Sequence, residues 1–274
     1  FCATGQMGFE RNLSAAEIVD QVRLASALVA EEDSRITNIV YMGMGEPLLN
    51  LQAVLDSVRI ITDPRGLNMG HRSLSISTIG IPAGIRRLAR TEPQVNLAVS
   101  LHAPDDDTRS LLVGENHRHP LDKVLAAAWD HFEITHRKLM VEYVLIEGIN
   151  DSVAQARHLA KLLQGHVVTV NLLAWNPLDA SRPVPDPSGL ARARDRRDRA
   201  SRRRPFTLKP SGSTAISAFR DTLAAAGIET VVRRSKGASI SAACGQLAAI
   251  TTQPGGRRSS AIRARQVKPT NEDR

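Results

Sequence analysis

The chain has 274 residues, of which 42% are hydrophobic and 23% charged, so it can bury a sizeable core and lacks the composition of a disordered protein. It contains no run of about eighteen apolar residues, which excludes an ordinary membrane-spanning helix, and no signal peptide is recognisable. Its two cysteines are too few for a secreted disulfide scaffold of this size, so we expect a protein of the reducing cytoplasm.

The net charge of +8 is unevenly distributed along the chain. Residues 179–210 carry a net charge of +6 and residues 253–274 a net charge of +4, which leaves the remainder slightly acidic. The two basic stretches either contact the phosphates of a nucleic acid or keep exposed peptide solvated.

Helices and strands alternate from the first periodic segment onward. Ser14 and Glu17 form a capping box ahead of a helix over residues 14–29. Strands are then predicted at 36–42, 73–78, 95–101, 138–146 and 167–174, with helices at 51–61, 83–90, 121–132 and 153–163. This alternation indicates parallel βαβ units, arranged either as a barrel or as a doubly wound sheet, and therefore an α/β fold.

Residues 179–213 interrupt this alternation with five prolines and an arginine-rich run. No apolar stripe is present there, so we predict a basic loop or disordered insertion. A helix at 215–226, ended by Gly227, and a strand at 229–233 follow. We expect one domain over residues 1–249, with the insertion inside it, and a disordered basic tail over 250–274.

Polar residues follow several predicted strands, where ligands bind in parallel βα folds. Glycine and carboxylate follow the first strand, hydroxyl groups end the next two, and an amide follows the fifth; these are Gly45, Glu46, Ser77, Ser100, His102 and Asn176. Taken singly, Glu46 fits a solvated turn and His102 fits a loop cap. Together they predict one pocket for a ligand the size of an adenine and an amino acid.

The two cysteines allow more than one interpretation. Cys244 precedes Gly245 and is either a small buried hydrophobe or a reactive thiol. Cys2, taken alone, holds no metal cluster.

Together the motifs resemble the RlmN/Cfr family of radical S-adenosylmethionine RNA methyltransferases, with more likeness to the RlmN branch. The matching segments, in the family's order, are FCATGQMG with RNLSAAEI, YMGMGEPLLN, SISTIG, VNLAVSLHAP, VEYVLIEGIND, VNLLAWNP and AACGQL. They extend from Phe1 to about Leu247, interrupted by the basic insertion. The arginine-rich segment is longer than the corresponding loop of the family.

The resemblance implies a partial (β/α)6 radical SAM barrel that lacks its first strand. It also implies a [4Fe–4S] cluster on three cysteines, of which Cys2 would be the last, with S-adenosylmethionine on the remaining iron. The first two cysteines would precede Phe1, so we expect an N-terminally truncated chain that assembles no cluster by itself. The cofactor-binding residues carried over are Gly45, Glu46, Ser77, the run Ser100, Leu101 and His102, and Asn176.

For catalysis the resemblance implies Cys244 as a methyl carrier and C2 of an adenine as the acceptor. The substrates would be 23S rRNA and tRNA, with the base exposed from its stack. The enzyme would be a monomer and would take electrons from a donor such as flavodoxin. Two alternatives stay open: a Cfr-type enzyme that methylates C8, and an inactive remnant that only binds RNA. A phosphate-binding barrel is disfavoured because the strand ending at Trp175 leads into prolines rather than glycines.

Overall fold

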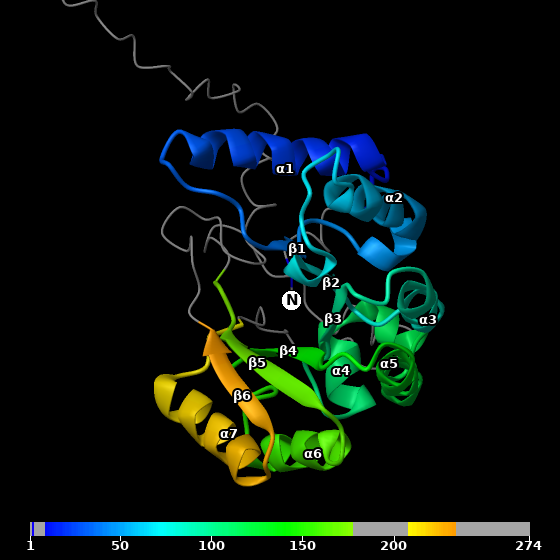
Figure 1. Ribbon diagram of the computed structural model, residues 1–274. Coiled ribbons are helices and arrows are strands. Elements are labelled where there is room, and N and C mark those ends of the chain that lie inside the picture. The colour runs from blue at the N-terminus through cyan, green and yellow to red at the C-terminus, as the bar shows by residue number, and fades with distance from the viewer. Residues whose placement is uncertain (1, 3–8, 178–207, 234–274) are drawn as a thin grey trace, which may run out of the picture.

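The computed structural model describes Cys2, residues 9–177 and residues 208–233. Six parallel strands form one sheet in sequential order, β1 to β6. They are β1 (Ile39–Tyr41), β2 (Leu74–Thr78), β3 (Asn96–Ser100), β4 (Leu139–Leu145), β5 (Val168–Ala174) and β6 (Glu229–Arg233). Figure 1 shows them following an arc with the helices on its outer side. The α/β fold and the partial barrel are thus confirmed.

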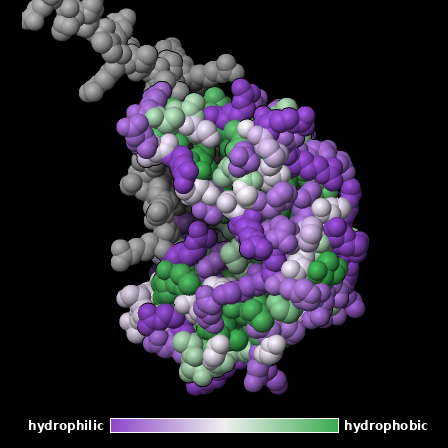
Figure 2. Space-filling view, in the orientation of Figure 1, coloured by the Kyte–Doolittle hydropathy of each residue, from purple (hydrophilic) through white to green (hydrophobic). Residues whose placement is uncertain are grey.

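The connecting helices lie where the periodicity predicts them. They are α1 (Ala15–Ala30), α2 (Leu51–Thr62), α3 (Pro82–Thr91), α5 (Leu121–Thr135), α6 (Val153–Leu163) and α7 (Ser213–Ala225). Reciprocal capping boxes begin two of them, Ser14 with Glu17 for α1 and Ser152 with Gln155 for α6. The outer surface over α2, α3 and α5 is mostly hydrophilic (Figure 2), as expected for amphipathic helices that pack on a sheet.

The two faces of the sheet differ in chemistry. On the helix-covered face, Leu74, Ile76, Leu97 and Val99 are fully buried in the main core. Strand alternation turns their neighbours to the inner face, where several are polar: Ser75, Ser77, Asn96, Ser100, Glu142 and Asn171. Parallel sheets normally carry apolar side chains on both faces, so a polar inner face indicates a ligand site there.

Two local differences from the sequence prediction stand out. A short helix α4 (Asp106–Leu112) and the 3₁₀ turns η2 (Pro47–Asn50), η3 (His71–Ser73) and η4 (Gly114–His117) were not predicted. Strand β1 is shorter than 36–42, because as an edge strand it pairs with β2 alone, over Ile39–Tyr41. Charged residues dominate the first turn of α4, which hides its period.

Some of the predicted insertion packs against the sheet. Leu208 and Ser211 are buried, Pro210 bridges Ile146, and the Ser211 hydroxyl donates to Asp151 at 2.7 Å. Residues 208–212 of the predicted insertion are thus a loop packed on the sheet, while 178–207 and 234–274 lie outside the described residues. Within the ranges that are described, no helix is both long and apolar enough to cross a membrane.

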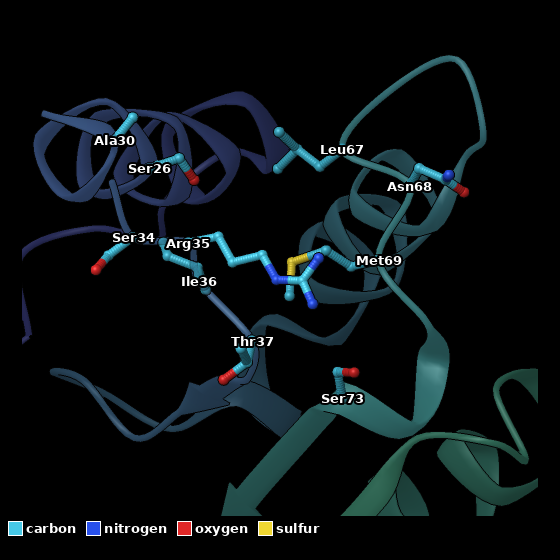
Figure 3. Close-up of a pocket in the computed structure, with 10 residues that line it drawn as sticks. All are labelled: Ser26, Ala30, Ser34, Arg35, Ile36, Thr37, Leu67, Asn68, Met69 and Ser73. Atoms are coloured by element: carbon cyan, nitrogen blue, oxygen red, sulfur yellow. The ribbon is translucent and has the colours of Figure 1, made fainter. Parts of the chain in front are cut away.

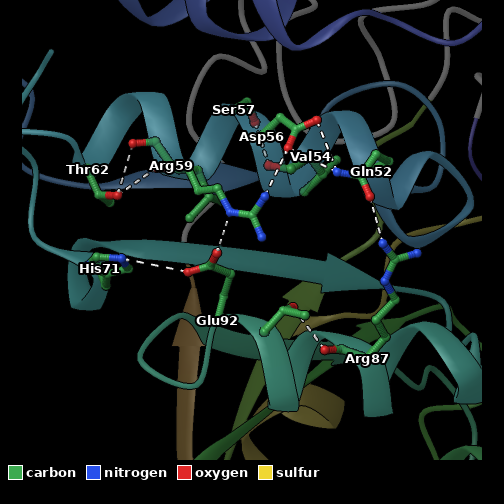
Figure 4. A network of polar contacts seen from close by, with 11 residues as sticks. Gln52, Val54, Asp56, Ser57, Arg59, Thr62, His71, Arg87 and Glu92 are labelled. Carbon is green, nitrogen blue, oxygen red and sulfur yellow. Dashed lines mark hydrogen bonds and ion pairs between the residues drawn. The ribbon is translucent and has the colours of Figure 1, made fainter.

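A buried carboxylate joins three elements beside the sheet (Figure 4). Glu92 follows α3 directly. Its Oε1 lies 3.3 Å from Arg59 Nε of α2, and its Oε2 lies 3.7 Å from His71 Nε2 of η3. Its side chain is only 9% exposed, so the stability of the buried carboxylate charge depends on these partners. Asp56, which pairs with the same arginine, is 42% exposed.

We expect Glu92→Gln to lower the free energy of unfolding by about 1–2 kcal/mol, because a buried charged partner is lost. Asp56→Asn is the matched control and should change it little, since exposed pairs contribute little. Urea denaturation of both variants measures the difference. Equal effects in the two variants would contradict the role of burial.

Candidate cofactor site

The first strand ends in a turn that a glycine makes possible. Gly45 has a φ of +95°, and a Cβ built on Gly43 or Gly45 would meet no atom within 4 Å, so open space adjoins the turn. Glu46 follows and caps η2, its Oε1 accepting from Leu48 N at 3.0 Å. Its Oε2 accepts from Ile79 N at 2.9 Å, at the end of β2.

Glu46 is consequently a fixed, half-buried carboxylate rather than a freely solvated turn residue. Burial raises its pKa above the ordinary value, while the backbone donors of Ile79 and Leu48 oppose the rise. A carboxylate held in this way at the junction of two strand ends is a suitable acceptor for an ammonium group.

Two hydroxyl groups meet on the inner face of the sheet. Ser77 Oγ on β2 and Ser100 Oγ on β3 lie 3.3 Å apart, and either can donate. Ser77 is 9% exposed. The sequence prediction that these two serines share a site is in keeping with this geometry.

His102 closes the end of β3 in an unusual backbone conformation, with a φ of +62°. Its Nδ1 accepts from Val144 N at 3.0 Å, so that ring nitrogen is unprotonated. Burial, with a smaller contribution from Arg109, lowers the pKa of His102 to about 3. The imidazole is neutral and holds the loop to β4, which matches the loop-capping alternative; contact with a cofactor stays a prediction.

Leu101 and Asn176 differ in what they offer a ligand. The Leu101 side chain is fully buried in the main core, its N–H donates to Glu142 O at 3.0 Å, and its carbonyl accepts from Arg109. Asn176 is the second residue after β5 and is half-buried; the N–H of Trp175, which precedes it, donates to Leu145 O at 3.1 Å. The structure thus brings Asn176 to the carboxyl ends of β4 and β5.

Arg109 of α4 organises this edge of the sheet and was missed by the sequence analysis. Its side chain is 1% exposed, and its guanidinium donates to the carbonyls of Ile79 after β2 and of Ser100 and Leu101 at β3. Asn116 Oδ1 accepts from the same group. Burial lowers the pKa of Arg109 to about 10, so it stays charged near neutral pH.

The Asn150 side chain likewise binds backbone groups, at the end of β4. Its amide donates to His102 O at 2.8 Å and to Val144 O, and its Oδ1 accepts from Ile146 N at 2.7 Å. The side chain is fully buried. Arg109 and Asn150 together fix the backbone of the 100–102 run.

Glu142 and Asn171 also escaped the sequence analysis. Asn171 Nδ2 donates to Glu142 Oε1 at 2.8 Å, and Ser100 and Glu142 are register partners on neighbouring strands. A carboxylate or an amide inside an otherwise largely apolar strand was the signal available in the sequence.

The cysteines of this chain are too few to hold a [4Fe–4S] cluster on three thiolates. Cys2 is half-buried, and no group of three or more His, Cys, Asp or Glu side chains suited to a metal occurs among the described residues. The whole sequence has two cysteines, and Cys244 lies outside the described residues. A three-cysteine cluster therefore cannot be completed by this chain's own thiols.

The pocket of about 460 Å³ in Figure 3 is a separate feature. Arg35, Thr37 and Ser73 line it near the amino ends of β1 and β2, opposite the edge where parallel βα folds bind ligands. The carboxyl edge remains the candidate cofactor site.

Comparison with known proteins identifies the fold family. The model of the "Radical SAM superfamily" matches residues 1–179. The chain belongs to the radical SAM superfamily. Membership in this superfamily implies a [4Fe–4S] cluster and S-adenosylmethionine as cofactors.

Two similar curated proteins carry RlmN names. The chain is 44% identical over 94% of its length to the "Probable dual-specificity RNA methyltransferase RlmN" of Frankia alni, covering 56% of that protein. It is 41% identical over 94% of its length to the "Dual-specificity RNA methyltransferase RlmN" of Sorangium cellulosum, covering 60% of it. The chain thus spans somewhat more than half the length of these curated relatives.

A solved structure of a radical SAM protein is similar to this chain in fold. A "radical SAM methyltransferase from Sphaerobacter thermophilus" superposes with a TM-score of 0.79 at 43% identity, covering 90% of this chain and 65% of that one. A domain of a pyruvate-formate lyase-activating enzyme from Bacteroides vulgatus, 13% identical with a TM-score of 0.50, shares the fold alone.

Proposed function

We propose that the chain is the catalytic core of an RNA methyltransferase that transfers a methyl group from S-adenosylmethionine to C2 of an adenine in 23S rRNA and tRNA. The observation that carries the proposal is the polar carboxyl edge: the Gly45 turn, the fixed Glu46 carboxylate and the Ser77–Ser100 hydroxyl pair. Similarity to RlmN-type enzymes supports the substrate class.

The residues of the site have distinct tasks in this proposal. Glu46 accepts the ammonium group of the cofactor, while the open space beside Gly45 admits the methionine portion. Ser77, Ser100 and Asn176 provide hydrogen bonds to its polar groups, and the backbone of the 100–102 run holds its position. Arg109 and Asn150 keep that run in place without touching the ligand.

Cys244 receives the methyl group first. Its thiolate attacks the sulfonium methyl carbon, the carbon–sulfur bond to the donor breaks, and S-adenosylhomocysteine leaves with the electron pair. An adenine C2–H has no lone pair with which to attack a sulfonium methyl directly, so a carrier is needed. Transfer from sulfur to carbon is the radical chemistry for which the superfamily uses its cluster.

The proposal also covers the enzyme's location, its oligomeric state, its electron donor and its contacts with RNA. The enzyme acts in the cytoplasm as a monomer, takes electrons from a donor such as flavodoxin, and contacts RNA phosphates through its basic stretches. The chain alone has no methyltransferase activity, because it supplies one cysteine of the cluster set. A Cfr-type enzyme acting on C8 would use the same residues, so the product decides between them.

The test uses the full coding sequence from which the chain comes, expressed anaerobically in a host that lacks its own adenine-C2 methyltransferase. We expect mass spectrometry of rRNA and tRNA nucleosides to show 2-methyladenosine. It should disappear in Cys244→Ala, because the carrier thiol is lost. The 274-residue chain expressed alone should give no product.

Three results would contradict this proposal or narrow it. Detection of 8-methyladenosine instead would assign the enzyme to the C8 reaction. Full activity in Cys244→Ala would remove the carrier. Salt-sensitive RNA binding without any S-adenosylmethionine binding would identify an RNA-binding remnant.

A further inference from the structure

A row of polar side chains crosses the inner face of the sheet, with Ser100, Glu142 and Asn171 in one lateral register and the Ser77 hydroxyl beside that of Ser100. We call Ser77, Ser100, Glu142 and Asn171, on strands β2 to β5, the inner row. The serine hydroxyls lie 3.3 Å apart, Ser100 pairs in register with Glu142, and Glu142 pairs with Asn171. The proposed cofactor surface at Ser77 and Ser100 therefore continues without interruption onto β4 and β5, which lie side by side in Figure 1.

Glu142 is unusual among the residues of this row. It is 5% exposed, yet its carboxylate accepts a single hydrogen bond among the described residues, from Asn171 Nδ2 to Oε1 at 2.8 Å. An ionised carboxylate has about four acceptor positions, and burying it costs free energy unless they are used. Burial accordingly raises its pKa.

Arg233 of β6 does not fully account for this carboxylate. Its Nη1 is 3.8 Å from Glu142 Oε2, longer than a charge-assisted hydrogen bond of about 2.8 Å. The arginine side chain is 45% exposed, so water competes for it. Glu142 Oε2 thus keeps acceptor capacity for donors on the inner face.

We propose that Glu142, oriented by Asn171, accepts hydrogen bonds from the ribose hydroxyls of S-adenosylmethionine. The inference rests on the proposed function, because it takes the same cofactor at the same edge of the sheet. A carboxylate is the acceptor that nucleotide-binding proteins use for a ribose hydroxyl. The Asn171 amide donates to Oε1, which leaves Oε2 as the oxygen available to the ribose.

The spacing across the sheet agrees with this assignment. The Glu46 carboxylate reaches the end of β2 through Ile79, and Glu142 lies on β4, two strands away. Neighbouring strands are about 4.8 Å apart, so the two carboxylates are separated by roughly 10 Å. The aminobutyrate chain and sulfonium of the cofactor can bridge that separation, with the ammonium at Glu46 and the ribose at Glu142.

The test measures ligand affinity and needs no turnover. Isothermal titration calorimetry would give the Kd of S-adenosylhomocysteine and of its 2′,3′-dideoxy analogue for the wild-type chain and for Glu142→Gln. We expect the wild type to prefer the hydroxylated ligand about tenfold, as for loss of hydrogen bonds to a charged group. In Glu142→Gln this ratio should fall below about threefold, with the analogue's own Kd unchanged.

Two further variants keep the result interpretable. Glu229→Gln on β6 removes a 57% exposed glutamate paired with Lys138, and should leave the ratio at the wild-type value. Asn171→Ser removes the amide that orients Glu142 and should lower the ratio to an intermediate value. If Glu142→Gln does not fold, the wild-type ratio and Asn171→Ser decide.

The outcomes separate this inference from the proposed function. A ratio near one in the wild type, or an unchanged ratio in Glu142→Gln, overturns the ribose contact while binding of S-adenosylhomocysteine still supports the cofactor site. Absence of any binding by the wild type overturns both. A ratio that falls in Glu142→Gln and not in Glu229→Gln establishes the contact.

Discussion

Replacing Arg109 with methionine is expected to lower the free energy of unfolding by about 3–5 kcal/mol, the range for breaking a buried charged network. The side chain is 1% exposed, and its guanidinium satisfies backbone carbonyls at the ends of two strands together with Asn116. Methionine fills a similar volume but donates nothing, so these buried acceptors lose their partner. Domains are typically stable by only about 5–15 kcal/mol, so the loss is large.

Arg86→Met is the matched control for this prediction. Arg86 of α3 is 38% exposed and pairs with Asp130 at 2.6 Å, so its loss should cost less than about 1 kcal/mol. Urea denaturation curves of the two variants give the comparison. If Arg109→Met unfolds within about 1 kcal/mol of the control, the buried guanidinium does not hold the strand ends together.

The fold could be predicted because its signals are local. The alternation of strands and helices, and the capping box at Ser14 and Glu17, are properties of short segments, and all six strands appear where the pattern predicts them. The missed elements are short and polar, such as α4 with its aspartates in the first turn. Periodicity cannot identify a helix of two turns whose charged residues outnumber its apolar ones.

The site could be predicted only incompletely because its contacts are distant in sequence. Glu46 bonds Ile79 across 33 residues, and Asn150 bonds His102 across 48. Arginine is normally exposed, so nothing in the sequence marks Arg109 as a buried donor. The strand-end residues could be proposed as a site because the fold class puts such residues at one edge. Their supporting side chains depend on packing that one sequence does not display.

Two buried histidines should make the stability of the protein fall steeply in mild acid. Burial lowers the pKa of His131 to about 4, assisted by the charge of Arg137, and that of His102 to about 3. Both side chains lie in the folded core as neutral imidazoles, and His131 Nε2 has no hydrogen-bond partner among the described residues. In the unfolded chain each histidine titrates near its ordinary value of about 6.5.

The sign of the effect follows from proton uptake. Between pH of about 6.5 and 4 the unfolded state binds more protons at these two side chains than the folded state, so stability decreases as the pH falls. The slope is at most about 1.4 kcal/mol per pH unit for each histidine. Glu46 and Glu142 act in the opposite direction, because burial raises their pKa and the folded state then binds their protons first.

His131→Phe isolates one of the two contributions. Phenylalanine keeps a ring in the core but cannot take up a proton, so the variant should gain stability relative to the wild type as the pH falls from 6.5 to about 4, and the gain should level off below that. Urea denaturation at half-unit steps from pH of about 3 to about 7.5 measures it. His158→Gln, at an exposed position on α6, is the matched control. A parallel curve for His131→Phe would mean that His131 titrates alike in the folded and unfolded chains, and that its burial carries no cost in protonation.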